Sequence, residues 1–287
     1  MPTDTTWQRR LLLQVGGPVA AVVLLVIFWD FAVWHYSIPR YVMPSPADVW
    51  EHITGDWPTL WKGMRTTFVE FLFGFVCGTG AGFVFAVIMD AAAVARSALY
   101  PILIASQAVP IIAISAALTI WLGFGLAPKL VIVALTVFFP VVVNVLDGLA
   151  AVDRDMISLA KSMGGSRLSI FRHIKLPATY TPLFSALKLS ATFSVTGAVI
   201  GEWTASTSGG LGAYLLQANS RLNTSGTFAA ITLLAALGIA SFLLVVLVEY
   251  VLTPWRSSSR ARRLSPRFWR ASKPTTTAVD GAGAFAS

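Results

Sequence analysis

Long apolar runs separated by short polar segments dominate the chain. A helix needs about 20 mostly apolar residues to cross the hydrocarbon core of a bilayer. Six stretches are close to this length: residues 18–34, 67–89, 99–122, 128–149, 182–203 and 228–252. The pattern predicts an all-α membrane protein with six transmembrane helices, and an even number of crossings leaves both termini on one side.

Composition leads to the same class. Of the 287 residues, 56% are hydrophobic and 12% are charged, and the mean hydropathy is +0.72. Soluble domains carry about 25% charged residues, and disordered chains combine low hydrophobicity with high net charge, so both classes are excluded. The single cysteine, Cys77, excludes an intrachain disulfide and a cysteine metal cluster.

Positive charges orient the chain in the membrane. Fifteen of the 21 Lys and Arg residues lie in segments on the side of the N-terminus, and five lie in segments on the other side. Because cytoplasmic loops are enriched in Lys and Arg, both termini are expected in the cytoplasm. The sequence then divides into a cytoplasmic N-terminus (1–17), a membrane domain (18–253) and a basic, partly disordered cytoplasmic tail (254–287). Anionic lipid headgroups balance such a tail, so the net charge of +8 does not indicate nucleic acid.

Two long segments connect the crossings. The outer one, 36–66, carries apolar residues at helical spacing, among them Val49, Ile53 and three tryptophans, and is expected to hold a short helix on the outer surface. The inner one, 150–181, places Met156, Leu159, Ala160 and Met163 on one helical face.

Glycines divide this inner segment. Gly164 and Gly165 end its first helix, Ser166 is a suitable N-cap for a second, and Pro177 is expected to end the second helix. Leu168, Phe171 and Ile174 share one face of that helix. The amphipathic pattern fits a linker lying on lipid headgroups and an element that docks on a partner equally well.

The spacing in this loop resembles that of the permease subunits of ATP-binding-cassette (ABC) importers, whose cytoplasmic loop has the form E-A-A-x3-G-x9-I-x-L-P. Here Ser158-Leu159-Ala160 precedes Gly164 by the same interval, and Ile174-Lys175-Leu176-Pro177 follows at the family distance, although the glutamate and first alanine are absent. The stretches YVMPSPADVW, VPIIAISAALTIWLGFGLAPK, FFPVVVNVLDGL and GAVIGEWTASTSGGLGAYL are similar to the branch that imports nitrate, sulfonates, taurine and pyrimidine precursors of thiamine.

The resemblance implies a type I importer permease in the bacterial plasma membrane, working with ABC ATPase subunits, a second permease copy and an extracytoplasmic solute-binding protein. ATP and Mg²⁺ are then bound by the partner ATPase, and the second loop helix, about 166–174, is the coupling helix that seats in it. The residues expected to couple this chain to the ATPase are Ser158, Ala160, Gly164, Ser166, Arg167, Leu168, Phe171, Arg172, Ile174 and Pro177.

Motifs for chemistry are absent from the sequence. It has no G-x4-G-K-[ST] phosphate loop, and His35, His52 and His173 are far apart with no metal-ligand spacing. The chain is therefore expected not to be an enzyme, and to have no cofactor or metal of its own.

Polar residues within the apolar runs are candidates for a translocation path, because charged and polar groups in membrane spans are often functional. They are Gln107, Pro110, Asn144, Glu202 and Trp203, with helix packing as the alternative explanation for the first three. Gly74, Gly78 and Gly82 form a repeated GxxxG face, which indicates close packing against another helix.

Two other classes remain as alternatives. An ion-coupled secondary transporter would use carboxylates such as Glu70 and Glu202 and would contain inverted repeats, which the sequence does not show. A membrane-embedded enzyme would need a catalytic or metal-binding set. For an importer, the solute is expected to be a pyrimidine thiamine precursor, a sulfonate or nitrate.

Overall fold

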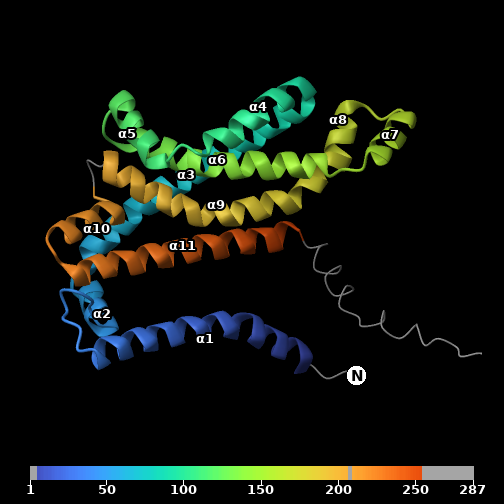
Figure 1. The fold of residues 1–287 in the computed structure, drawn as a ribbon. Helices are drawn as coiled ribbons and strands as arrows, with labels where there is room; N and C mark the ends of the chain where they lie inside the picture. Colours follow the sequence, from blue (N-terminus) through green and yellow to red (C-terminus); the bar gives the residue numbers. More distant parts are fainter. Residues whose placement is uncertain (1–4, 206–208, 254–287) are drawn as a thin grey trace, which may run out of the picture. The chain divides into compact units, whose positions relative to one another are not determined.

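The computed structural model describes residues 5–205 and 209–253, apart from the side chains of residues 5–15, 18 and 93. Every regular element in these ranges is a helix, as the hydrophobic pattern predicts (Figure 1). The helices are α1 (Thr5–His35), α2 (Pro46–Gly55), α3 (Trp57–Ala91), α4 (Ala93–Ser106), α5 (Ile111–Leu122), α6 (Leu126–Ala150), α7 (Arg154–Ser162), α8 (Arg167–Ile170), a π-helical turn η1 (Phe171–Lys175), α9 (Leu176–Ala205), α10 (Leu211–Ser220) and α11 (Thr224–Leu252). The basic tail, 254–287, and residues 1–4 lie outside the described residues. The first compact unit of the chain ends at Val246, and all packing described below lies within it.

Four helices of the described ranges are long and apolar enough to cross a membrane: Trp57–Ala91, Leu126–Ala150, Arg167–Ala205 and Thr224–Leu252. Helices α4 and α5 pass the same test only as a pair, and Val19–His35 in α1 is a shorter apolar helix. The described residues thus supply four or five of the six expected crossings by length and composition. The remaining one, 18–34, coincides with the apolar part of α1.

The third crossing expected over 99–122 is not one continuous helix. The helices Val94–Ser106 and Ile111–Leu122 are bent by 97° at the break between them. Pro110 has no N–H to continue the helical ladder, and the N–H groups of Ala108 and Val109 bond in tight turns to the carbonyls of Ala105 and Ser106. Hydropathy averages over such a break, but Pro110 marks its position in the sequence.

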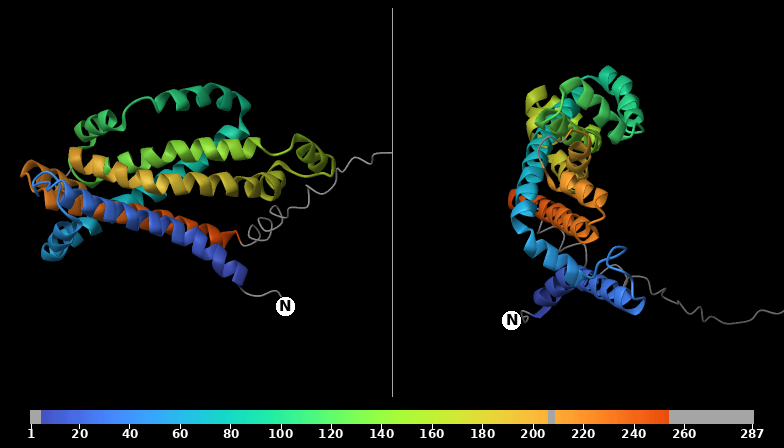
Figure 2. Two further views of the ribbon diagram at one scale, coloured as in Figure 1. Left: turned by 60° about the horizontal axis from the view of Figure 1, so that its bottom comes forward. Right: turned by 90° about the vertical axis from the view of Figure 1, so that its left-hand side faces the viewer.

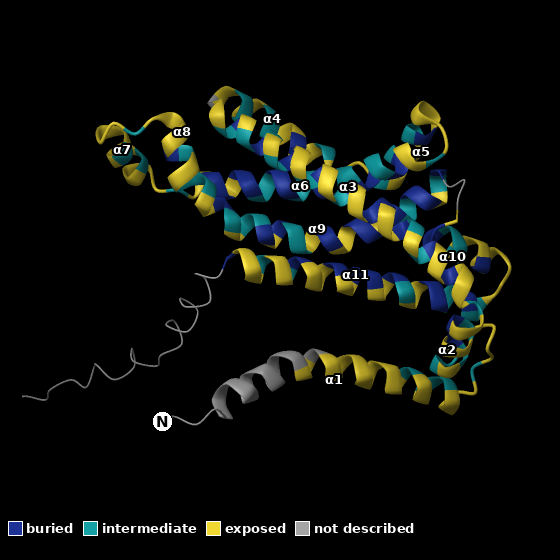
Figure 3. Ribbon diagram, turned by 180° about the vertical axis from the view of Figure 1, so that it is seen from behind, coloured by how far each residue is buried: buried dark blue, intermediate teal, exposed yellow. Residues whose placement is uncertain are grey.

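Helix α6 is the centre of the fold and packs extensively against both α3 and α9. Figure 3 shows buried residues concentrated on α6 and α9, whereas the described part of α1 is largely exposed. Branched aliphatic side chains fill this centre because they pack densely and hold one preferred rotamer in a helix. The fully buried valines and isoleucine of α6 are Ile132, Val133, Val137, Val141, Val142 and Val145.

The predicted GxxxG contact is confirmed. A Cβ added to Gly74 would lie 2.5 Å from the Cβ of Val133, and one on Gly82 would lie 2.9 Å from the carbonyl oxygen of Phe138. Gly78 faces the backbone of Ala134 even more tightly. Three glycines spaced by four residues thus bring α3 and α6 into backbone contact over two helical turns.

The predicted helix in the outer segment is also present, as α2. Val49 and Ile53 are buried, and Ser45 and Asp48 form a capping box at its N-terminus, with 3.0 Å from the Ser45 N–H to Asp48 Oδ2 and 3.2 Å from the Asp48 N–H to Ser45 Oγ. The start of the next crossing differs from the prediction. Helix α3 begins at Trp57, ten residues before the expected start at 67, because the tryptophans of the outer segment continue directly into it.

We predict that Gly78→Ala destabilises the protein by about 1–3 kcal/mol, because the new methyl group has no room against the α6 backbone. Gly80→Ala is the matched control, since Gly80 lies on the same helix with open space at its Cβ position. Thermal unfolding of the detergent-solubilised variants measures the difference. Equal melting temperatures for the two variants would contradict the packing described here.

The capping box makes α2 sensitive to acid. The hydrogen bonds from Ser45, helped by Arg40 at 3.2 Å, hold the pKa of Asp48 below its usual value. A lowered pKa in the folded state means that the cap is fully present above about pH 4 and is lost as the pH falls further through the folded pKa. Hydrogen exchange at Val49–Ile53, corrected for intrinsic rates, should accelerate as the pH is lowered from about 5 to about 2, the range in which aspartates ordinarily titrate. A Ser45→Ala variant, in which the cap is already weakened, should show a smaller change.

Candidate functional site

The loop 150–181 folds into two short helices that project beyond the end of α6 (Figures 1 and 2). Helix α7 is capped by Asp153, whose carboxylate accepts the Asp155 N–H at 2.9 Å. Helix α8 is capped by Ser166, whose hydroxyl accepts the Ser169 N–H at 3.2 Å. The order expected from the sequence, a helix, a glycine corner and a second helix begun by Ser166, is confirmed.

The corner between them is a Schellman motif, a helix end closed by two backbone hydrogen bonds. The Gly164 N–H bonds to the Lys161 carbonyl at 3.0 Å, and the Gly165 N–H bonds to the Ala160 carbonyl at 2.9 Å. Gly164 has a φ of +83°, which L-residues rarely adopt. The spacing between Ala160 and Gly164 in the sequence pattern therefore corresponds to one helix end. Ala160 is the third residue from the end of α7, and Gly164 is the first residue beyond the C-cap.

The corner presents apolar side chains to its surroundings. Leu159, Met163 and Leu168 are 63%, 80% and 74% exposed, and Met156 is also exposed. Ser158, Ser166, Arg167 and Arg172 are exposed beside them. Exposed apolar patches rimmed by polar groups are typical of surfaces that bind another molecule.

Other residues of the same loop face the bundle instead. Ile170 is buried, Phe171 is half-buried and packs against the main apolar cluster, and Ile174 is half-buried. The face expected to carry Leu168, Phe171 and Ile174 together is thus divided, with Leu168 pointing outward and the other two holding the corner to the membrane helices.

The prediction that Pro177 ends the second loop helix is wrong. Helix continues from Arg167 to Ala205 without a break. The turn Phe171–Lys175 is π-helical, and the Leu176 N–H reaches back to the Phe171 carbonyl. This wider turn immediately precedes the proline, which lies in the first turn of α9, where its missing N–H interrupts the ladder least.

An ion pair ties this turn to a second helix. Lys175 Nζ lies 2.7 Å from Asp90 Oδ2, at the end of α3, and both side chains are mostly shielded from solvent. The corner is therefore joined to α9 by the backbone and to α3 by a salt bridge.

The residues expected in a translocation path do not form one cluster. Gln107 and Pro110 are exposed at the break between α4 and α5. Asn144 is half-buried in α6 and donates its side-chain N–H to the Pro140 carbonyl at 2.8 Å. Glu202 and Trp203 lie near the far end of α9, where the Trp203 indole N–H bonds to the Gly212 carbonyl at 2.9 Å.

Glu202 belongs to a buried polar cluster that joins three long helices and α10. Its Oε1 accepts the Thr67 hydroxyl at 2.6 Å, and its Oε2 accepts the Ala213 N–H at 2.9 Å. Beside it, Lys129 Nζ lies 2.7 Å from Glu70 Oε1, and neither side chain is more than 2% exposed. A side chain on Gly210 would collide with the Glu202 carboxylate, so the glycine-rich turn is shaped around this acid.

Sequence reasoning missed this cluster in part. Glu70 and Glu202 stand out as charges within apolar runs, but Lys129, at the outer end of the run 128–149, counts among the five Lys and Arg residues of the outer segments, and nothing in the pattern marks Thr67. The signal that the sequence offers is a lysine at the start of a long apolar run, together with two acidic residues, Glu70 and Glu202, in other apolar runs. No spacing rule connects residues so far apart in the chain.

A second polar network lies among α2, α10 and the start of α3. The Tyr214 hydroxyl donates to Asp56 Oδ2 at 3.0 Å, which leaves His52 Nε2 to donate to the Tyr214 oxygen at 2.9 Å. Burial, followed by the neighbouring Asp56 carboxylate, raises the pKa of Tyr214 to about 12. The phenol thus stays neutral and keeps α10 attached to α2.

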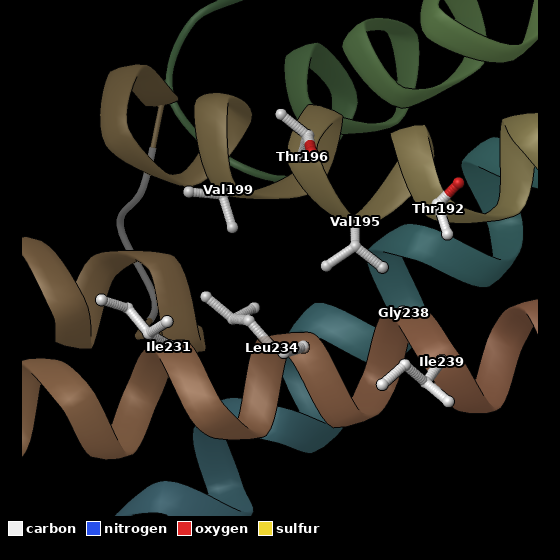
Figure 4. Close-up of a pocket in the computed structure, with 9 residues that line it drawn as sticks. Thr192, Val195, Thr196, Val199, Ile231, Leu234, Gly238 and Ile239 are labelled. Carbon is white, nitrogen blue, oxygen red and sulfur yellow. The ribbon is translucent and has the colours of Figure 1, made fainter. Parts of the chain in front are cut away.

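Two cavities lie near these elements. One of about 410 Å³ separates α9 from α11 and is lined mainly by aliphatic residues with Thr192 and Thr196 (Figure 4). The other, of about 370 Å³, is an open cleft where Trp203, Gln217, Ser220 and Arg221 surround Glu202. Only the second offers charged groups and several hydrogen-bonding side chains to a polar molecule.

We predict that Gly164→Ala loosens the corner without unfolding the protein. Forcing an alanine into the left-handed region costs about 1–2 kcal/mol, and space is not the obstacle because no atom lies within 4 Å of the added Cβ. Hydrogen exchange over residues 154–170 should accelerate while the melting temperature stays unchanged. Ser162→Ala, at the end of the same helix, should leave both quantities at the wild-type value; an equal effect of the two variants would contradict the assigned corner.

Comparisons with known proteins agree with this arrangement. A family model described as "Binding-protein-dependent transport system inner membrane component" matches residues 78–254. The chain is 29% identical to the riboflavin transport system permease protein RibX of Chloroflexus aurantiacus, over 90% of this chain and 96% of that one. It is 28% identical to the formylaminopyrimidine transport permease protein ThiX of Halalkalibacterium halodurans, over 85% and 97%.

The fold is shared with a solved transporter. A chain of the MetNI methionine ABC transporter, solved in inward-facing conformations, superimposes with a TM-score of 0.54 and 21% identity, covering 73% of this chain and 99% of that chain. The family match spans most of the membrane domain and contains the glycine corner. The chain therefore belongs to the binding-protein-dependent transport system inner membrane components, and it is a multi-pass plasma-membrane permease subunit of an ABC importer.

Proposed function

We propose that this chain forms the translocation path of an ATP-driven importer and receives its driving force through the corner formed by α7 and α8. Two copies pair around the path, and two ABC ATPase subunits, which bind ATP and Mg²⁺, dock on the corners from the cytoplasm. A binding protein delivers the solute on the opposite side. This arrangement uses six crossings of the type I importer fold with both termini in the cytoplasm, where the tail faces lipid headgroups.

The observation that carries this proposal is the exposed apolar face of the corner. Met156, Leu159, Met163 and Leu168 present large side chains to solvent at the end of a rigid, capped unit. Burying them in a groove of the ATPase would stabilise the complex, and exposed Arg167 and Arg172 would meet acidic groups at its rim. Ala160 keeps the closely packed side of the corner small, and the exposed Ser158 lies beside the apolar face.

Continuity of the helix supports transmission of movement. The corner continues through η1 into α9 without an interruption, and Phe171, Ile174 and Pro177 lie in the connecting stretch. Closure of the ATPase dimer would displace the corner and, because the backbone is helical throughout, would turn α9 with it. ATP binding would open the path outward, and hydrolysis would return it to the inward-facing state.

The path itself is proposed to include Gln107 and Pro110 at the break in the third crossing, Asn144, and the outer residues Glu202 and Trp203. The bend at residues 107–110 exposes backbone and side-chain polar groups at membrane depth, which are tolerated where they line a cavity. The open cleft around Glu202 and Trp203 supplies an aromatic wall, a carboxylate and donors from Gln217 and Arg221.

For the solute we propose a small nitrogen heterocycle of the pyrimidine thiamine-precursor type, ahead of a sulfonate or nitrate. Support comes from the two relatives named above, whose printed names give riboflavin and formylaminopyrimidine. Membership of the importer family leaves no role for an ion-coupled secondary mechanism.

We predict that Leu168→Ala reduces co-purification of the ATPase and ATP-dependent uptake about tenfold, because truncating one buried anchor costs about 1–3 kcal/mol. The uptake assay uses proteoliposomes with the cognate ATPase and binding protein, supplied with formylaminopyrimidine and, separately, taurine. Leu189→Ala is the control, since Leu189 is similarly exposed (55%) but lies within α9, away from the corner. Normal ATPase binding and uptake by Leu168→Ala would overturn the docking proposal.

A further inference from the structure

Helices α3 and α9 are joined by ionic contacts at two levels. At one level, Asp90 of α3 pairs with Lys175 beside the corner at 2.7 Å. At the other level lies the buried cluster described above, hereafter called the outer clamp. It consists of Glu70 and Thr67 of α3, Lys129 of α6 and Glu202 of α9.

The separation of the two levels matches the membrane. Glu70 and Asp90 are twenty residues apart in α3, which is about 30 Å along a helix axis and equals the usual thickness of the hydrocarbon core. Between them, Gly74, Gly78 and Gly82 hold α3 in backbone contact with α6. Helix α3 is therefore tied to α6 and α9 at the outer face of the apolar layer, to η1 at the inner face, and to α6 along the depth between them.

Lys129 is central to the outer clamp. It pairs directly with Glu70, it interacts electrostatically with Glu202, and the α6 backbone at Lys129 approaches Gly201 so closely that a Cβ there would lie 3.1 Å from the Lys129 Cα. One ammonium group thus lies between carboxylates of two other helices. Removing it would leave two buried acids without their cation, which is far more costly than losing a surface pair.

We propose that Lys129 is a positioning residue for transport: through Glu70 and Glu202 it fixes the outer end of α9 to α3, so that α3, α6 and α9 move as one rigid body between the corner and the turn leading into α10. The role in transport rests on the proposed function, but the clamping of the helices does not. Glu202 also holds the Ala213 N–H, and Thr67 accepts the Leu211 N–H at 2.9 Å. Movement of the inner end of α9 would therefore reach α10.

The test measures a distance within one chain. Nitroxide labels are placed at Ala178→Cys, exposed at the inner end of α9, and Gln217→Cys, exposed on α10, in a Cys77→Ser background. Labelled chains are diluted with unlabelled ones, purified with the ATPase, and studied by double electron–electron resonance with and without ATP. The rigid-body proposal predicts one narrow distance distribution that ATP leaves unchanged.

In Lys129→Met the same distribution should broaden and shift by about 5 Å, the pitch of one helical turn, whereas Lys129→Arg should restore the narrow distribution. Thr67→Ala, a milder change that releases Glu202 from α3, should broaden it less and covers the case in which Lys129→Met does not fold. Val133→Ala, a core truncation one turn along α6, controls for general destabilisation and should remain narrow.

Three results would overturn the proposal: an ATP-dependent change of the distance in the wild type, an unchanged narrow distribution in both Lys129→Met and Thr67→Ala, or equal broadening in Val133→Ala. Failure of the proposed function would look different, because the ATPase would then not co-purify with any variant. The comparison without ATP would still test the clamp in that case.

Discussion

One uninterrupted helix from Arg167 to Ala205 constrains everything else in this molecule. It begins at an exposed apolar corner and ends at a buried acid, so the two most distinctive sites of the chain are the ends of one continuous helical stretch. Figure 1 shows this stretch changing direction between α8 and α9, and a loss of helical hydrogen bonds there would absorb any movement applied to the corner. The π-helical turn before Pro177 keeps the helix continuous past the proline.

Close packing and buried charged groups both hold this helix in place. The glycines of α3 allow backbone contact with α6, where many weak dispersion contacts add up. A buried ion pair is by itself weak grounds for stability, since desolvation offsets much of the attraction, but it strongly penalises arrangements in which a partner is lost. The Glu70–Lys129 pair and Glu202 therefore specify how the helices are aligned more than they add to the free energy of unfolding.

Local signals in the sequence were sufficient for the corner and for the helix contact. The Ala160-to-Gly164 spacing, the Ser166 cap and the GxxxG repeat each depend on residues within one or two turns, and the structure confirms the local geometry of all three. The failures were of another kind. Pro177 predicts a helix end, but the turn before it widens instead. The partners of Lys129 lie on other helices, and only tertiary packing brings them together. The six crossings and the roles of the path residues stay predictions.

The central claim is that the corner is where a separate ATPase pushes on this permease. Photo-crosslinking from Leu159, an exposed apolar residue of α7, tests it most directly. A benzophenone amino acid replaces Leu159 or, as a reference, Leu189 within the membrane-spanning part of α9. Crosslinked products from native membranes are identified by mass spectrometry. The account predicts crosslinks from position 159 to a phosphate-loop ATPase and none from position 189. Crosslinks from position 159 to lipid alone would contradict it.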